Sequence, residues 1–225
     1  MPVPKQIRGI ETKQKLLECS SELFWEYGYY DTTIRLISKR ANTNLGLFNY
    51  YFNGKIEIGA TVYHTMRSAF DSLIAEYEPS FDDVDVFLFS SALELYLCLE
   101  YPNFGKFFVE ISHEPYIYQR VINYIIRTFE QYSRGGAGEN FARLAGISIS
   151  SIKPSIVSYS LSSPDAISNE EYINYYLLQH LHFFGKDASL SEKYMKLFDK
   201  YHIALDKKMT PIFEPKDRSV SPPPL

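Results

Sequence analysis

Cysteine, long apolar runs and a leader segment are scarce or missing in this sequence. Cys19 and Cys98 are its only cysteines, which is too few for a disulfide framework or a cysteine-ligated zinc site. Every apolar run is shorter than the ~18 residues that a membrane helix needs, and residues 1–8 lack the apolar core of a secretory signal. We therefore expect a cytoplasmic protein that does not bind a membrane.

Catalytic motifs are missing as well. The sequence contains no P-loop, dinucleotide fingerprint, serine-nucleophile elbow or zinc-protease motif. His180 and His182 are two residues apart, so on a helix they point to different faces and do not chelate one ion. We interpret Glu100, Glu110 and Glu114 as surface or pocket-rim carboxylates. The sequence thus predicts neither an enzyme nor a bound metal or cofactor.

Aromatic residues and an uneven charge distribution are what the sequence does have. Aromatics make up 16% of the 225 residues, with 19 Tyr, 16 Phe and 1 Trp. Residues 1–55 hold eight Lys/Arg and five Asp/Glu, a net charge of +3, whereas the remainder hold fifteen and twenty-two, a net charge of −7. A basic end on an acidic body weakly favours nucleic-acid binding at that end.

Apolar residues recur at helical spacing along the chain, which predicts an all-α fold. The first helices are expected at 12–27, from about 32 to 41, at 44–50 and at 55–77. Further helices are expected at 84–101, 102–112, 116–132, 172–184 and 192–208. Residues 146–168 contain nine serines and Pro154, and their periodicity does not distinguish helix from strand.

We divide the chain into three parts. Residues 1–55 are predicted to form a three-helix, helix-turn-helix DNA-binding domain, and residues 56–210 a larger helical domain for ligand binding and dimerisation. Residues 211–225 contain five prolines and are expected not to fold.

The segment from residue 12 to residue 55 has the outline of a helix-turn-helix, in which the second helix of the pair enters the major groove. That recognition helix would span residues 44–50. We expect Asn44, Leu45, Leu47 and Asn49 to face the base edges. Gly46 would let a sugar-phosphate strand approach the backbone closely.

Three side chains at the end of this helix and just after it suit phosphate contacts. Tyr50 and Tyr51 can donate their hydroxyls, and Lys55 brings a cation to the start of the next helix. The alternative is that both tyrosines are ordinary half-buried residues of a tyrosine-rich chain.

Four segments in order resemble the N-terminal domain of TetR-type transcriptional regulators. They are residues 16–24 (LLECSSELF), 27–29 (YGY), 32–41 (TTIRLISKRA) and 46–55 (GLFNYYFNGK). The resemblance implies a homodimer that binds a double-stranded DNA operator and leaves it when a small molecule binds the second domain. It also implies phosphate contacts by Thr33, Tyr50, Tyr51 and Lys55, and base-facing positions at Asn44, Leu45 and Leu47.

The sequence departs from the family pattern in the turn and on the reading face. Asn42 replaces the usual glycine of the turn, and it is the best non-glycine residue for a left-handed conformation. Leu45 and Leu47 replace residues with more hydrogen-bonding capacity, although leucine can contact thymine methyls. The alternative function is therefore a helical ligand-binding or adaptor protein of the same descent without specific operator recognition.

The aromatic surplus beyond residue 60 has two interpretations: an ordinary core, or a cavity for a hydrophobic, aromatic or long-chain ligand. For the second, the expected wall residues are Tyr63, Met66, Phe70, Phe89, Tyr96, Phe104, Phe108, Ile122, Ile125 and Tyr175. Ligand binding would shift the helix 55–77 and change the distance between the two recognition helices.

The dimer is expected through helices 172–184 and 192–208. Their apolar residues at helical spacing are Tyr172, Tyr176 and Phe183 with Gln179 on the first, and Tyr194, Leu197, Phe198, Tyr201 and Leu205 on the second. The alternative is that these helices cover the core of their own subunit.

Overall fold

The computed structural model describes residues 5–132, 139–164 and 166–213, and these form ten helices without a strand. The predicted all-α fold is confirmed for this part of the chain. None of its helices is both long enough and apolar enough to cross a membrane. The helices are α1 (Lys5–Tyr27), α2 (Ile34–Arg40), α3 (Leu45–Tyr51), α4 (Lys55–Tyr77), α5 (Asp83–Glu100), α6 (Pro102–Ser112), α7 (Pro115–Tyr132), α8 (Glu139–Ser162), α9 (Asn169–Phe183) and α10 (Leu190–Phe213).

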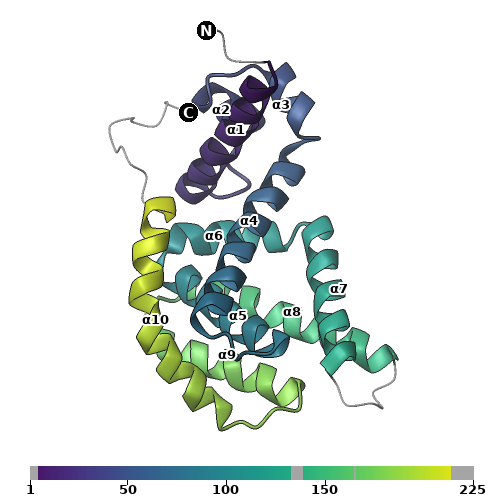
Figure 1. The fold of residues 1–225 in the computed structure, drawn as a ribbon, viewed down its shortest axis with the longest axis vertical. Helices are drawn as coiled ribbons and strands as arrows, with labels where there is room; N and C mark the ends of the chain where they lie inside the picture. Colours follow the sequence, from purple (N-terminus) through teal and green to yellow (C-terminus); the bar gives the residue numbers. More distant parts are fainter. Residues whose placement is uncertain (1–4, 133–138, 165, 214–225) are drawn as a thin grey trace.

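Helices α1, α2 and α3 form a small unit at one end of the molecule (Figure 1). Side-chain caps define both short helices: Thr33 Oγ1 accepts from the Leu36 amide at 3.2 Å, and Asn44 Oδ1 accepts from the Leu47 amide at 2.9 Å. The turn between them contains Asn42 at a φ of 52°, which confirms the left-handed position expected there.

Helix α4 leaves this unit and runs into the larger helical body, as Figure 1 shows. There it packs against α5, the most deeply buried helix, in which twelve of 18 residues are buried. Helix α5 also contacts α6, α8, α9 and α10, so the core of the body lies around it.

The segment whose periodicity was ambiguous is mostly helical. Residues 146–162 belong to α8, which continues through Pro154. Its serines are compatible with a helix because their hydroxyls donate to carbonyls one turn earlier, as Ser148 does to Leu144 and Ser155 to Ser151. The serine-rich composition of this segment is therefore no obstacle to a helix.

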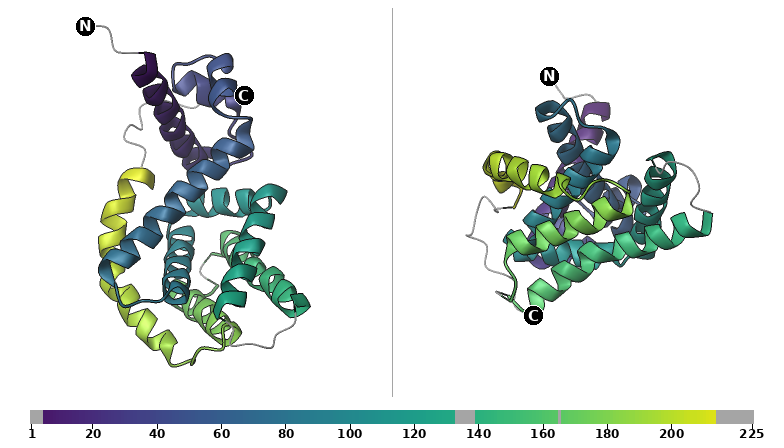
Figure 2. Two further views of the ribbon diagram at one scale, coloured as in Figure 1. Left: turned by 45° about the vertical axis from the view of Figure 1, so that its right-hand side comes forward. Right: turned by 90° about the horizontal axis from the view of Figure 1, so that it is seen from below.

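The predicted dimer face of the last helix is wrong. Helix α10 lies against α1, α5 and α9 of its own chain, along the side of the body (Figures 1 and 2). Its Tyr194, Phe198 and Tyr201 are at most 8% exposed. Phe198 packs edge-on against Tyr96, and Tyr194 lies beside Phe89.

The same holds for the first of the two helices, because Tyr172 and Tyr176 of α9 are buried as well. The apolar spacing of both helices thus reflects the core of one subunit. Of the tail predicted not to fold, residues 211–213 end α10, and residues 214–225 lie outside the described part of the chain, as does the side chain of Leu205.

Candidate DNA-binding surface and ligand cavity

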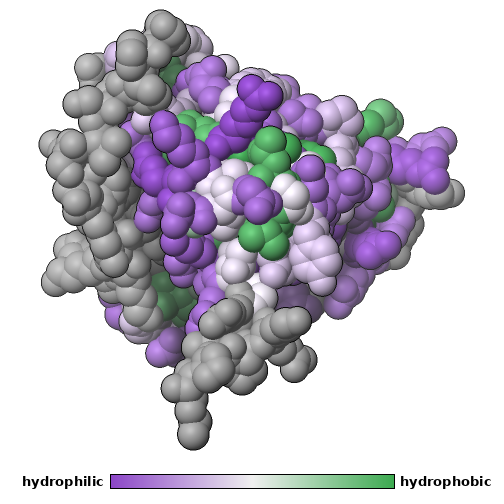
Figure 3. All heavy atoms as spheres, turned by 90° about the horizontal axis from the view of Figure 1, so that it is seen from above, coloured by the Kyte–Doolittle hydropathy of each residue, from purple (hydrophilic) through white to green (hydrophobic). Residues whose placement is uncertain are grey.

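The exposed face of α3 carries most of the predicted base-facing residues. Leu45 is 42% exposed, Leu47 is 39% exposed, and Asn49 and the cap Asn44 are also exposed, whereas Phe48 of the same helix is fully buried. Figure 3 views this end of the molecule and shows small hydrophobic patches among hydrophilic residues. The buried face of α3 therefore fixes which side chains point outward.

Gly46 lies on the same open face. A Cβ built at this position would meet only the Oδ1 of its neighbouring cap Asn44, at 3.2 Å, and no atom of another helix. The backbone is thus accessible from outside.

The predicted phosphate-contacting residues differ in their exposure and in the hydrogen bonds that they already make. Tyr50 is 79% exposed, and its ring packs edge-on against the half-buried Tyr51 with a centroid distance of 4.9 Å. Thr33 is exposed but already accepts the capping hydrogen bond of α2. Its hydroxyl can still donate a proton outward.

Lys55 also stabilises the turn after α1, a role that the sequence did not indicate. Its ammonium donates to the carbonyls of Tyr29 and Tyr30, at 2.9 and 3.2 Å, and lies 4.4 Å from the centre of the Tyr29 ring. Partial burial lowers the pKa of this side chain. Because an ammonium has three N–H groups, one is left for a phosphate.

Two further cations lie beside α3 that were not among the predicted residues. Arg35 and Lys39 are exposed on α2, and both line a shallow hollow of about 400 Å³ together with Asn44 and Leu45. Their spacing of four residues on a short helix was a signal for one basic face.

The larger body contains a cavity of about 450 Å³, a size typical of small-molecule sites. Its walls come from α4, α5, α6, α7, α8 and α9. Of the ten expected wall residues, Tyr63, Phe108 and Ile125 line it.

The other seven do not line this cavity. Met66, Phe70, Phe89, Phe104 and Ile122 are buried, Tyr96 is half-buried, and Tyr175 is 54% exposed. Phe104, for example, lies edge-on against Trp25 of α1 at a centroid distance of 5.1 Å. Most of the aromatic surplus therefore forms core, as the first of the two interpretations has it.

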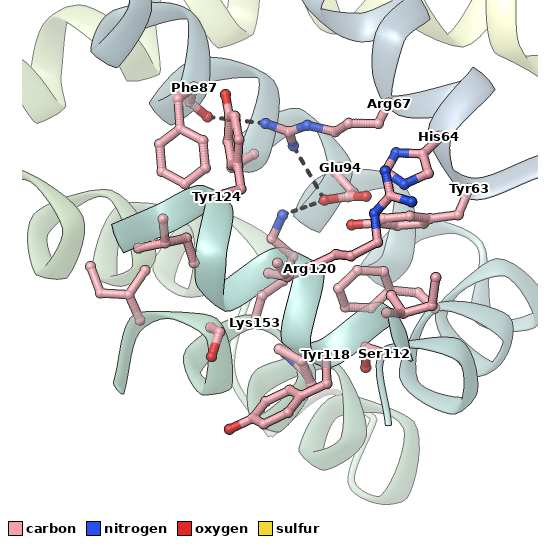
Figure 4. A pocket seen from close by; sticks show the side chains of 18 of the residues that line it. Tyr63, His64, Arg67, Phe87, Glu94, Ser112, Tyr118, Arg120, Tyr124 and Lys153 are labelled. Carbon is pink, nitrogen blue, oxygen red and sulfur yellow. Dashed lines mark hydrogen bonds and ion pairs between the residues drawn. The ribbon is translucent and has the colours of Figure 1, made fainter. Parts of the chain in front are cut away.

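Three charged side chains meet in the cavity (Figure 4). Glu94 is 1% exposed; its Oε2 lies 3.3 Å from Arg67 Nη1 and accepts a hydrogen bond from Lys153 Nζ. Burial opposes the ionisation of Glu94, but Lys153 and Arg67 outweigh it and lower the pKa of this carboxyl. Arg67 also donates to Ser90 Oγ at 2.6 Å. The cavity thus has a charged, internally paired wall.

His180 adds a neutral polar group. It is fully buried, and its Nδ1 lies 2.8 Å from the carbonyl oxygen of Tyr176. Burial lowers the pKa of His180 to about 3, so the ring is uncharged at neutral pH. With a proton on Nδ1 for the Tyr176 carbonyl, Nε2 is a hydrogen-bond acceptor.

Sequence reasoning did not single out Arg67, Glu94 or Lys153. A signal for Glu94 was available, because it is the one charged residue within the run 86–99 of α5. A charge in such a run is buried on any helix face and needs a partner. The partner itself, 59 positions further on, could not be read from the sequence.

Comparison with known proteins agrees with this architecture. Residues 16–58 match the family described as bacterial regulatory proteins, tetR family. A TetR-family transcriptional regulator from Syntrophomonas wolfei superimposes with a TM-score of 0.55 at 25% identity, over 78% of this chain and 95% of the other. No curated protein sequence matches this one significantly.

Two more solved structures share the fold. RolR in complex with resorcinol aligns with a TM-score of 0.56 at 18% identity, over 84% of this chain and 95% of that protein. The regulator TylP of Streptomyces fradiae aligns with a TM-score of 0.51 at 16% identity, over 85% and 98%.

Proposed function

Since this chain belongs to the TetR family of transcriptional regulators, we propose that it is a cytoplasmic repressor that a small molecule in the cavity releases from its operator. Residues 1–55 would bind DNA, and residues 56–210 would bind the ligand and the second subunit. One observation carries this proposal: α4 both begins at the helix-turn-helix and forms a wall of the cavity.

The exposed face of α3 supports the DNA contacts. We assign Leu45, Leu47 and Asn49 to base edges, with Asn44 at the helix start. Thr33, Tyr50, Tyr51, Lys55, Arg35 and Lys39 are assigned to phosphates. Gly46 would lie against the sugar-phosphate backbone.

Coupling would run through α4. Tyr63, His64 and Arg67 line the cavity from the middle of this helix, and Lys55 at its start is bonded to the turn after α1. A ligand that shifts α4 would move the recognition helix and its distance from the one in the partner subunit. Two such helices need about 34–36 Å between them to enter successive major grooves.

The ligand would be a small hydrophobic or aromatic molecule. The rings of Tyr63, Phe87 and Phe108 line the cavity, which supports an aromatic guest. RolR, which shares the fold, was crystallised with resorcinol, a small aromatic compound.

TetR regulators are dimeric, and the surface of α8 and α9 is suited to a twofold interface in this chain. Leu144 is 65%, Tyr159 50% and Tyr175 54% exposed. Exposed serines of α8, such as Ser148, Ser151 and Ser155, would let a partner helix approach closely. Together, these residues replace the face of α10 as the proposed interface.

DNA binding by the full chain tests the proposal. We expect fluorescence anisotropy to show specific binding to DNA from upstream of its own gene. Substitution of Lys39 by Ala should weaken binding to all sequences and reduce the salt dependence by about one counterion. Leu47→Ala should instead change sequence preference, and Lys196→Ala, at an exposed lysine of α10, serves as the control.

Equal affinity for operator and random DNA across a salt series would contradict the proposed repressor function. It would favour the alternative of a ligand-binding protein without operator recognition.

A further inference from the structure

Five side chains from four helices, α4, α5, α8 and α9, form one continuous polar and aromatic wall of the cavity. Arg67 lies 5.7 Å from the centre of the Phe87 ring, and that ring lies 6.3 Å from His180. Lys153 lies 5.4 Å from the centre of the Tyr176 ring, and that ring is tilted by 40° against His180 with 3.9 Å between the ring centroids. A ligand in the cavity therefore meets the charged cluster and His180 together.

One buried acceptor on this wall lacks a partner. Among the described residues, His180 Nε2 has no hydrogen-bond partner, and the His180 side chain is 0% exposed. The Glu94 carboxylate, by contrast, is held by Lys153, Arg67 and the Tyr63 hydroxyl. Buried polar atoms are almost always hydrogen-bonded, because an unpaired one loses its hydration without compensation. His180 lines a cavity large enough for a ligand, which points to a guest that donates a hydrogen bond.

The groups around this atom limit the ligand further. A carboxylate has no proton to donate to Nε2, and an ammonium would face Arg67 and Lys153. A purely apolar molecule would leave Nε2 without a donor. Arg120 and Arg127 also line the cavity, but both are exposed to solvent, and Arg120 donates to the Tyr116 hydroxyl at 2.8 Å.

We propose that the effector is a neutral aromatic compound with a hydroxyl group, which donates a hydrogen bond to His180 Nε2 while its ring packs between Phe87, Phe108 and Tyr176. This assignment rests on the proposed function in taking the cavity as the effector site. This acceptor would then select hydroxylated rings over apolar ones of the same size, because a ligand without a donor leaves it buried and unpaired.

Calorimetric titration of the full chain with four probes of one ring size tests this selectivity. The probes are 2-naphthol, 2-methoxynaphthalene, 2-naphthoate and 2-(aminomethyl)naphthalene. We expect 2-naphthol to bind at least tenfold more tightly than each of the others. Equal binding of the methyl ether would show that water satisfies His180 Nε2 and would overturn the proposal, as would tighter binding of either charged probe or no binding of any.

Two variants test whether His180 causes the preference for 2-naphthol over its methyl ether. His180→Phe keeps a buried ring but removes Nε2, and it should reduce the preference for 2-naphthol over the methyl ether at least threefold. His182→Phe, at an exposed position two residues away, is the matched control and should leave it unchanged. An unchanged preference in His180→Phe contradicts the role of His180.

Binding and DNA release are separate readouts. Selective binding of 2-naphthol without DNA release would contradict the repressor mechanism alone, whereas DNA release by a charged probe would contradict this inference alone.

Discussion

Lys106 of α6 and Asp31 of the turn after α1 form an ion pair with 2.7 Å between Nζ and Oδ2. The same ammonium donates to the Tyr27 carbonyl at 2.9 Å, and one turn later Glu110 accepts from the Tyr30 amide at 2.9 Å. The hydrogen bond lowers the pKa of Asp31 and raises the pKa of Lys106. Because Phe108 of the same helix lines the cavity, α6 connects the ligand site to the end of α1.

Breaking this contact should weaken communication between the two sites. We expect Lys106→Met to leave ligand affinity within twofold of wild type but to reduce, at least threefold, the factor by which ligand lowers DNA affinity. The measurement is DNA affinity with and without saturating ligand. Lys196→Met is the control, and an unchanged coupling factor in Lys106→Met would assign coupling to α4 alone.

Glu94 should be needed for stability because of the cations it neutralises. Glu94→Leu leaves Arg67 and Lys153 buried without their carboxylate, and loss of one partner from a buried ion pair typically costs about 3–5 kcal/mol. Adding Lys153→Met should restore at least half of the lost free energy of unfolding. Urea denaturation of both single variants and the double variant measures this coupling, and additive losses would contradict it.

His180 should make stability depend on pH in the acid range. Burial, assisted by the charge of Lys153, lowers its pKa to about 3, against the opposing hydrogen bond to Tyr176. The unfolded chain, with a histidine pKa of about 6.5, therefore binds a proton below that pH which the folded chain does not bind. This group's contribution to the free energy of unfolding is complete above pH 6.5 and falls by about 1.4 kcal/mol per pH unit between about pH 6 and pH 3.

His180→Phe isolates that contribution. The stability difference between wild type and variant should shift in favour of the variant as the pH falls from 7 to 4.5, measured by urea denaturation. His182→Phe should not show this shift, since the side chain is exposed. Parallel curves for wild type and His180→Phe would mean that the folded protein binds the proton too.

Asn42 should be replaceable by glycine but not by a branched residue. At a φ of 52°, a side chain other than Asn or Gly costs roughly 1–2 kcal/mol. Asn42→Val should thus lower the free energy of unfolding by about that amount, and Asn42→Gly should keep it within about 0.5 kcal/mol. Thermal unfolding of the two variants distinguishes this backbone effect from loss of the side chain, which both share.

The α8 and α9 surface should control subunit association. Leu144→Asp combined with Tyr175→Asp places two charges in the proposed interface, so sedimentation should shift from a dimer to the 26.1 kDa subunit. Ile10→Asp, at a residue of α1 that is 68% exposed, is the control. A dimer that persists in the double variant would place the interface elsewhere.

Local features of the sequence predicted local features of the structure. The left-handed residue Asn42 was predicted from side-chain chemistry within a few positions, and the structure has it. The caps at Thr33 and Asn44 are equally local, since each side chain accepts from an amide three positions later. The family resemblance supplied the arrangement of the first three helices in the same way. Such local conformations can be predicted from the sequence because residues a few positions apart in the chain determine them.

The cavity depends on contacts between distant residues, and there the sequence was insufficient. Helical spacing shows which residues share a face but not which neighbour covers that face. Phe89 and Phe87 of α5 illustrate this, since Phe87 lines the cavity and Phe89 packs toward Tyr194 of α10. The tyrosines of α10 likewise indicated an apolar face without indicating that α5 of the same subunit covers it.

Helix α8 belongs to two surfaces at once. Ile149, Ser150 and Lys153 face the cavity, while Leu144 and Tyr159 are exposed on the proposed subunit interface. Pro154 of the same helix has no backbone N–H and cannot donate to the carbonyl of Ser150. The helix therefore lacks one internal hydrogen bond beside the cavity. Any factor by which the ligand changes subunit affinity through this helix must equally be the factor by which pairing changes ligand affinity. The dose of ligand to which a cell responds would then depend on how many copies of the protein it contains.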